Sequence, residues 1–452
     1  MKGKVAFTSL GCDKNRVDSE VMLGILHQRG YQAVAEEAEA DLIVVNTCCF
    51  IRDALEESIE TILEMAKYKT EGKCKGLIVT GCLGQRYEKE FFEELPEVDA
   101  VLGTAAYEEI ADAADRILSG EHGFKCLEDI DKSMKNENGK LRILSTAPYT
   151  AYLKISEGCD NHCTYCVIPK MRGKHRSRSM ESLVEEAEVL AKQGVKELVV
   201  VAQDTSIYGR DLYGTSKLHE LLEKLAQIPE IQWIRLLYCY PETLTQETIA
   251  VMANNKKICH YIDMPIQHGC DSILQRMGRK TSQAEIRETV KRLRAAMPDI
   301  AIRTTLIVGF PGETEQDFAQ LQDFVQEMRF DRLGVFCYSQ EEGTPAATMP
   351  NQISEEVKQE RKESIMQIQK NISAARCEQE IGNTLEVLVE GKLPEENIYC
   401  GRTQWDAPDI DGMVFFGAEE EPYSGDFVQV QIKEASDYDL IGDVVYADEF
   451  TE

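Results

Sequence analysis

The sequence predicts a multidomain α/β protein, with a parallel α/β domain, then a (β/α)6 partial barrel, then a small antiparallel β-barrel. Two series of short, β-branched strands alternate with helix-like stretches, which is the pattern of parallel sheets covered by helices. A third series of short alternating strands follows without helices between them. The length of 452 residues suits about three domains of this size.

We expect the first domain to span residues 1–120. Its expected strands are KVAFTSL, DLIVVN and GLIVTG, and its expected helices are SEVMLGILHQRG, ALEESIETILEMAKY and QRYEKEFFEEL. Residues 121–147 are polar and rich in glycine, lysine and asparagine, so we interpret them as a linker with possible strand structure near Leu141–Leu144.

We expect the partial barrel to span residues 148–377, with its chemistry at the C-terminal ends of the strands. A charged helical stretch from Ser354 to about Gln379 leads out of it. Residues 378–448 should then form the small barrel from LEVLVEG, MVFFG, FVQVQIK and DVVYAD. The six expected strands of the partial barrel are YLKIS, ELVVVA, WIRLLY, YIDMPI, AIRTTLIVG and LGVFCYS.

Composition narrows the class of protein. No apolar run reaches the roughly 18 residues that a membrane span needs, and the start, MKGKVAFTSLGC, lacks the features of a signal peptide. We therefore expect a cytoplasmic protein that does not bind membranes.

Its 15 cysteines are too sparse for a disulfide scaffold and odd in number. In a reducing compartment such cysteines more often bind metal or take part in chemistry.

The charge is concentrated at the C-terminus. The formal net charge is −29, and the segment Glu378–Glu452 carries 20 acidic and three basic residues, a net −17. Such a surface repels a phosphate backbone and attracts a basic protein. The alternative is that the acidic surface serves solubility alone, which would fit an even spread of charge better.

The run Cys159-Asp-Asn-His-Cys163-Thr-Tyr-Cys166 directly follows the first expected strand of the partial barrel. Three thiolates from one tight loop can hold three corners of a 4Fe-4S cluster, which leaves one iron open for a small molecule. A structural zinc site is the alternative, but it usually needs two pairs of ligands. His162 lies inside the loop, where it is poorly placed to serve as a fourth ligand.

Three further cysteines share a different context, because each follows an expected strand of the first domain. The carboxyl ends of parallel strands lie along one edge of a sheet, so these thiolates can converge there. For any single cysteine, a buried structural role is the usual alternative. The three residues are Cys12, Cys48 and Cys82.

The loop at Cys159 resembles the signature of the radical S-adenosylmethionine (SAM) superfamily, and two triplets in this order resemble the methylthiotransferase family over essentially the whole chain. The resemblance implies two 4Fe-4S clusters with three cysteine ligands each, SAM bound at the second, and a C-terminal TRAM domain, which is an OB-like barrel. It also implies that the first cluster serves sulfur insertion and the second generates the radical. The match at Asn46-Thr47-Cys48 favours Cys48 as a ligand, although Cys49 stands where glycine is common.

The resemblance extends to other candidate site residues. Tyr165 matches an aromatic position, and the segment Leu306–Glu313, with Gly309 and Glu313, resembles the one along the adenosyl group of SAM. That segment could instead be a plain strand-to-helix turn. Further polar residues at strand ends could line the SAM or substrate pocket, or could simply hold the barrel together: Gln203, Asp204, Gln267, His268 and Arg303.

One branch of the family modifies the β-carbon of an aspartate in the twelfth small-subunit ribosomal protein. Six segments of this sequence resemble those of that branch: SLGCDKNRVDSE, QDTSIYGRD, YIDMPIQH, GFPGETEQDF, YSQEEGTPA and DAPDIDG. It implies a basic ribosomal protein or the ribosome as partner, and an electron donor such as a flavodoxin or ferredoxin. The alternatives are a transfer-RNA adenosine methylthiotransferase and a non-catalytic two-cluster electron carrier. The basic residues between Lys170 and Arg178 could touch nucleic acid, offset cluster charge or lie on the surface.

Overall fold

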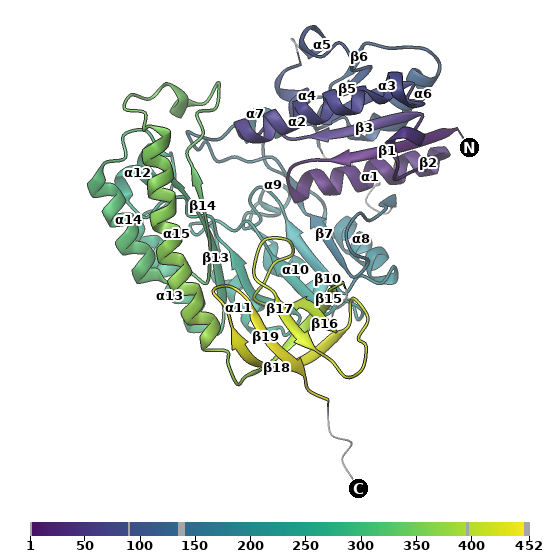
Figure 1. Cartoon of the computed structure of the whole chain (residues 1–452). Coiled ribbons are helices and arrows are strands. Elements are labelled where there is room, and N and C mark those ends of the chain that lie inside the picture. Colours follow the sequence, from purple (N-terminus) through teal and green to yellow (C-terminus); the bar gives the residue numbers. More distant parts are fainter. Residues whose placement is uncertain (1, 89–90, 134–140, 395–396, 447–452) are drawn as a thin grey trace.

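The computed structural model describes residues 2–88, 91–133, 141–394 and 397–446. Figure 1 shows the N-terminal sheet in purple and blue at one end of the central barrel, and the C-terminal barrel in yellow at the other end. The expected fold class is confirmed: two six-stranded parallel sheets precede a closed five-stranded barrel.

The first sheet has the strand order β2-β1-β3-β4-β5-β6. Side chains alternate between its two faces, so that Val44 packs with helices α1 and α6 while Val45 packs with helix α2. The elements are β1 (Gly3–Ser9), α1 (Asp13–Arg29), β2 (Tyr31–Ala33), β3 (Leu42–Thr47), α2 (Arg52–Ala66), α3 (Tyr68–Glu71), β4 (Gly76–Gly81), α4 (Cys82–Arg86), α5 (Phe91–Glu94), β5 (Ala100–Leu102), α6 (Ile110–Leu118) and β6 (Phe124–Cys126).

The three expected strands of this sheet are confirmed, but three short strands were missed. QRYEKEFFEEL does not form one helix: α4 ends at Arg86 and α5 begins at Phe91, and residues 89–90 of the expected helix lie outside the described residues. The expected strand at Leu141–Leu144 is wrong. Within this segment Arg142 is buried, and its guanidinium bonds to Glu20 of α1 at 2.5 Å and to Glu186 at 2.6 Å.

The second sheet has the order β14-β13-β12-β11-β10-β7, so sequential strands lie side by side, and all six expected strands are confirmed. Its elements are β7 (Thr150–Lys154), α7 (Ile168–Arg172), α8 (Met180–Lys192), β10 (Glu197–Val201), α9 (Arg210–Tyr213), α10 (Leu218–Ala226), β11 (Trp233–Leu236), α11 (Gln246–Asn254), β12 (Ile258–Asp263), α12 (Asp271–Arg276), α13 (Gln283–Ala296), β13 (Ala301–Val308), α14 (Glu315–Met328), β14 (Arg332–Cys337) and α15 (Glu355–Glu378). A small ribbon of β8 (Ser156–Glu157) and β9 (Arg176–Ser177) flanks the cysteine loop.

The C-terminal barrel closes in the order β15-β16-β17-β19-β18. Its neighbours are antiparallel except β17 and β19, which run parallel. The strand β16 was missed, and residues 447–448 of the expected strand DVVYAD lie outside the described residues. The strands are β15 (Thr384–Lys392), β16 (Ile398–Arg402), β17 (Val414–Gly417), β18 (Phe427–Ala435) and β19 (Leu440–Val444).

Glu197, at the start of β10, joins the two barrels. Its side chain is fully buried and accepts hydrogen bonds from Arg235 of β11 at 2.9 Å and from Arg402 of β16 at 2.6 Å. Burial alone would raise the pKa of Glu197, but Arg402 and Arg235 outweigh it and lower the pKa to about 2.

We expect Glu197→Gln to destabilise the fold by about 3–5 kcal/mol, because it leaves two buried guanidinium groups without their shared carboxylate. A depressed carboxyl pKa stabilises the folded state above the unfolded pKa of about 4.3, and this contribution is lost as the pH falls towards the folded value. Thermal melting between pH 7 and pH 2 should therefore show wild-type and variant converging in acid. The exposed Glu223→Gln serves as control, and a constant gap at all pH values would contradict the account.

Candidate functional site

The N-terminal triplet lies at one edge of the first sheet. Cys12 occupies the N-cap of α1 after β1, Cys48 follows β3, and Cys82 is the first residue of α4 after β4. The strands β1, β3 and β4 are neighbours in the sheet, so their carboxyl ends bring the three loops together. Gly11, with φ of 87°, lets the first loop approach closely: a Cβ there would lie 2.7 Å from Cys48 Cβ.

Polar side chains fix these three loops relative to one another. The Asn15 amide donates to the carbonyl of Leu10 at 3.1 Å and to the carbonyl of Thr47 at 3.0 Å. The Thr47 hydroxyl in turn donates to the carbonyl of Thr80 at 2.7 Å. Each contacted carbonyl lies within two residues of a cysteine of the triplet, so hydrogen bonds set the spacing of the thiols before any cluster binds.

Cys49 faces the apolar core of the first domain. It is fully buried, its Sγ lies 3.4 Å from the Sδ of Met171, and its carbonyl accepts a hydrogen bond from Arg86. Cys48 keeps 8% of its surface exposed. Burial raises the pKa of the Cys48 thiol to about 12, with Cys82 as the next cause. This placement favours Cys48 as the ligand of the triplet, and the assignment stays a prediction.

The second triplet lies in the loop between β8 and α7. Backbone N–H groups point at two of its sulfurs: Asn161 donates to Cys159 Sγ and Ile168 donates to Cys166 Sγ, each at 3.4 Å. Such donors stabilise thiolates and the clusters that they bind. Burial raises the pKa of both thiols to about 12, so a bound iron would have to displace their protons.

The donor sets of both triplets fit iron–sulfur clusters. Thiolates are soft ligands that suit such clusters, and each triplet offers three of them. Among the side chains that the structure describes, no group of three or more His, Cys, Asp or Glu converges on a point where one ion could sit. A 4Fe-4S cluster takes each thiolate on a different iron, so its ligands surround the cluster instead of meeting at a point.

Two of the predicted SAM-pocket residues make structural contacts. Gln203, just past β10, donates to Glu157 at 2.6 Å. Arg303 of β13 pairs with Asp263 at 3.2 Å and with Asp411 of the C-terminal domain at 3.4 Å. These contacts are those expected if the two residues hold the barrel together, and their role towards SAM stays a prediction.

The segment after β13 also has a clear structural role. Gly309 has φ of 72°, and a Cβ there would lie 2.2 Å from Lys358 Cγ. Glu313 accepts from the Phe310 N–H at 3.0 Å and from Arg361 of α15 at 3.2 Å, and burial raises its pKa to about 7. These contacts tie the turn to α15, and any contact of Gly309 and Glu313 with SAM stays a prediction.

The remaining predicted residues line the same end of the barrel. Tyr165 packs against an apolar cluster that includes Phe310 and Tyr338. His268 is fully buried, and burial lowers its pKa to about 3, so it is neutral near pH 7. Gln267, after β12, has φ of 73°, a left-handed backbone that is uncommon outside glycine.

A cleft of about 430 Å³ lies beside the Cys159 loop, and the sequence indicated only part of it. Asp204 was expected at this strand end; it accepts from the Asn161 amide at 3.2 Å, and burial raises its pKa to about 6. Asn161, Tyr240 and Glu242 were missed. Asn161 stands between two cysteines of the loop, and that position is the signal that could have found it.

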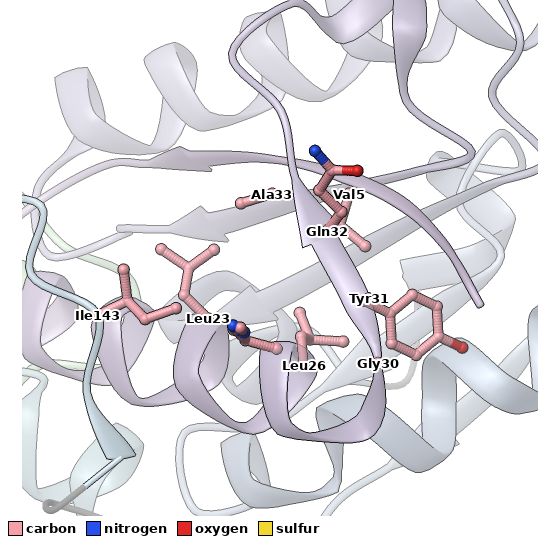
Figure 2. A pocket seen from close by; sticks show the side chains of 9 residues that line it. Val5, Leu23, Leu26, Gly30, Tyr31, Gln32, Ala33 and Ile143 are labelled. Carbon is pink, nitrogen blue, oxygen red and sulfur yellow. The ribbon is translucent and has the colours of Figure 1, made fainter. Parts of the chain in front are cut away.

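A second hollow, of about 470 Å³, lies away from both triplets. Figure 2 shows Leu23, Leu26 and Tyr31 around it, at the outer end of α1 and β2. Its lining is mainly apolar, so it offers little to a charged cofactor such as SAM.

The basic stretch is partly buried. Arg172 is 2% exposed and Arg178 is 6% exposed. Arg178 pairs with Glu186 at 2.5 Å, and Arg172 pairs with Glu157 at 2.8 Å. These two cations are therefore committed to partners inside the protein. Arg172 Nη2 also lies 3.8 Å from Cys82 Sγ of the N-terminal triplet, a contact that was missed because the two residues are distant in sequence.

Known proteins match nearly the full length of the chain. The uncharacterized protein family UPF0004 matches residues 4–103, the radical SAM superfamily matches residues 153–325, and the TRAM domain matches residues 381–445. A relative from Lachnoclostridium phytofermentans, ribosomal protein uS12 methylthiotransferase RimO, is 54% identical over 441 residues, which are 97% of this chain and 99% of the relative. The RimO of Clostridioides difficile is 52% identical over 98% of this chain and 99% of that relative.

The chain belongs to the RimO family. It therefore belongs to a family of radical SAM enzymes that transfer a sulfur group. Among solved structures, the radical SAM methyltransferase TsrM from Kitasatospora setae, with cobalamin and a 4Fe-4S cluster bound, matches with a TM-score of 0.56 at 14% identity and covers 88% of this chain and 81% of TsrM. That similarity supports the fold alone. None of the described helices has the length and apolar character that crossing a bilayer requires.

We expect Cys48→Ala to lose most of the iron of the N-terminal site, because a thiolate ligand is removed. Cys49→Ala is the matched control, since the neighbouring thiol packs in the core, and it should retain that iron. Iron and sulfide analysis after anaerobic reconstitution measures both variants. Loss of iron in Cys49→Ala with retention in Cys48→Ala would reverse the assignment.

Proposed function

We propose that this chain transfers a methylthio group to ribosomal protein uS12, at the β-carbon of an aspartate. The observation that carries the proposal is the end-to-end similarity to uS12 methylthiotransferases, at 54% identity over 97% of the chain. Both cysteine triplets lie within the residues that the family models match, 4–103 and 153–325. The aspartate and its β-carbon come from the resemblance in the sequence motifs.

One side chain connects the first triplet to the segment that carries the second. Arg172 ends the helix that follows the Cys159 loop, and its Nη2 lies 3.8 Å from the Sγ of Cys82 in the first domain. Arg172 also pairs at 2.8 Å with Glu157, which stands two residues before Cys159. That supports a reaction in which hydrogen removal and sulfur delivery act on the same carbon.

The β-carbon of an aspartate carries an unactivated C–H bond. General-base catalysis contributes roughly 10²–10⁴-fold, far too little to deprotonate such a carbon. The 4Fe-4S clusters and SAM, when bound, supply the radical, sulfur and methyl chemistry. We propose that Cys159, Cys163 and Cys166 hold the cluster that binds SAM, and that Cys12, Cys48 and Cys82 hold the other.

A buried contact between the domains closes part of their junction to water, although Cys12 itself is exposed. Lys14, two residues after Cys12, is buried, and its Nζ lies 3.1 Å from the centre of the Tyr238 ring, just past the end of β11. Lys14 also pairs with Asp13 at 2.9 Å. The N-terminal domain thus packs against the barrel just past the carboxyl end of β11, at the end of the barrel where exclusion of water protects a reactive intermediate.

Charge supports a protein substrate over RNA. The C-terminal segment carries a net −17, which suits a basic ribosomal protein and opposes a phosphate backbone. Burial of Arg172 and Arg178 also removes two cations of the basic stretch from contact with RNA. We further propose a cytoplasmic location and a flavodoxin or ferredoxin as electron donor.

Anaerobic reconstitution with SAM, sulfide and a reductant tests the proposal. Incubation with uS12 should add one methylthio group at an aspartate, which tandem mass spectrometry locates. Transfer RNA in a parallel reaction should gain no mass. Modification of transfer RNA alone would contradict the protein substrate, and a failure to cleave SAM would contradict both enzyme functions.

The two triplets should divide the work. Alanine in place of Cys12, Cys48 or Cys82 should leave SAM cleavage largely intact and abolish methylthio transfer, because the cluster that receives electrons for cleavage is the other one. Formation of 5′-deoxyadenosine and modification of uS12 are measured on the same samples. Loss of SAM cleavage in these variants would contradict the assignment, and Cys159→Ala is the control that should lose both.

A further inference from the structure

Arg172 connects the N-terminal triplet to Glu157, which stands two residues before Cys159. Arg172 is the last residue of α7, six positions after Cys166, and it is 2% exposed. Although it belongs to the central barrel, its guanidinium reaches the first domain. Nη2 lies 3.8 Å from the Sγ of Cys82 and also donates to the side-chain carbonyl of Asn15.

The other end of the guanidinium faces two carboxylates. Nη1 donates to Glu157 at 2.8 Å and to Asp18 of α1 at 3.2 Å. Lys154 of β7 pairs with the same two carboxylates. The charges of the two cations and the two anions cancel. The carboxylates hold Nη1 of the guanidinium, while Nη2 remains directed at the sulfur.

Asn15 extends the reach of Arg172 to the other two loops. While its carbonyl oxygen accepts from Arg172, its amide donates to the carbonyls of Leu10 and Thr47, which precede Cys12 and Cys48. Arg172 therefore contacts one cysteine of the triplet directly and the loops of the other two through one side chain. It comes from a different domain than every cysteine that it serves.

A guanidinium stays protonated under all ordinary conditions and has a fixed fork of donors. Hydrogen bonds to cluster sulfurs, and a positive charge beside them, stabilise the reduced cluster and raise its reduction potential. Lys154 carries the same charge, but it pairs with the two carboxylates, whereas Arg172 also contacts a sulfur.

We propose that Arg172 is a positioning residue that the barrel supplies to the N-terminal cluster, where it orients the ligand loops and raises the reduction potential of that cluster. The inference rests on the proposed function in placing a cluster at Cys12, Cys48 and Cys82. It adds that this cluster site is complete only when the barrel is docked. One side chain of the radical-generating domain would then complete the cluster site of the sulfur-inserting domain.

The test uses the full-length chain with Cys159, Cys163 and Cys166 replaced by Ala, so that only the N-terminal cluster forms. In this background, Arg172→Met removes charge and donors, and Lys170→Met is the matched control on the exposed side of the same helix. Redox titration followed by electron paramagnetic resonance should give a more negative potential for Arg172→Met and an unchanged one for Lys170→Met. Competition with a chelator should show that Arg172→Met binds iron about 10–100-fold more weakly than the parent.

Two further variants separate cluster tuning from domain docking. Asp18→Asn removes an ion-pair partner of Arg172 but leaves the sulfur contact, so its potential should stay or become less negative. Arg172→Lys keeps the charge without the fork, so its potential should lie near the parent value while iron is released faster. Circular dichroism checks that each variant is folded.

Equal potentials and equal iron retention in Arg172→Met and Lys170→Met would overturn the inference. A shift of Arg172→Met and Asp18→Asn in the same negative direction would also overturn it, because the network would then act through docking alone. If the parent variant itself binds no iron after reconstitution, the cluster assignment in the proposed function fails, and the inference fails with it. Iron in the parent together with an unchanged potential in Arg172→Met defeats the inference alone.

Discussion

Four buried charged side chains hold the first domain against the partial barrel: Asp18, Lys154, Glu157 and Arg172. Each of the two cations pairs with both carboxylates. Arg172 lies 2.8 Å from Glu157 and 3.2 Å from Asp18. A buried charge without a partner is costly, so each domain would be left with unpaired charges if the two separated. The charge network therefore specifies one relative position of the domains, and both proposed cluster sites depend on that position.

The same constraint orders the chemistry. Parallel strands bring loops from distant parts of the sequence to one edge of a sheet, and each domain places its cysteines at such an edge. The charge network then connects Glu157, just before the second triplet, through Arg172 to Cys82 of the first. At the far end of the barrel, Glu197 and Arg402 hold the acidic C-terminal domain by a similar buried pair. The molecule thus couples three domains through buried charges and leaves the interior of each to apolar packing.

Much of this could be predicted from the sequence, because it follows from local pattern. Runs such as DLIVVN and ELVVVA are long and apolar enough to be recognised as buried strands, and parallel order then places the residues after them along one edge. The strands β2, β5 and β6 were missed because three residues carry too little periodicity. Contacts such as Arg172 with Cys82 were missed because they join residues 90 positions apart. The motif around Glu313 resembles a SAM contact, but it does not reveal the contacts of Glu313 within the protein. These are with Phe310 of the turn and with Arg361 of α15.

The central claim is that two clusters on one chain lie close to a shared position, where one substrate carbon loses hydrogen and receives the methylthio group. Pulsed electron paramagnetic resonance on the fully reconstituted, reduced protein tests it most directly. The account predicts a magnetic interaction between the two clusters that disappears when either cysteine triplet is replaced. Two reduced clusters with no detectable interaction would contradict it.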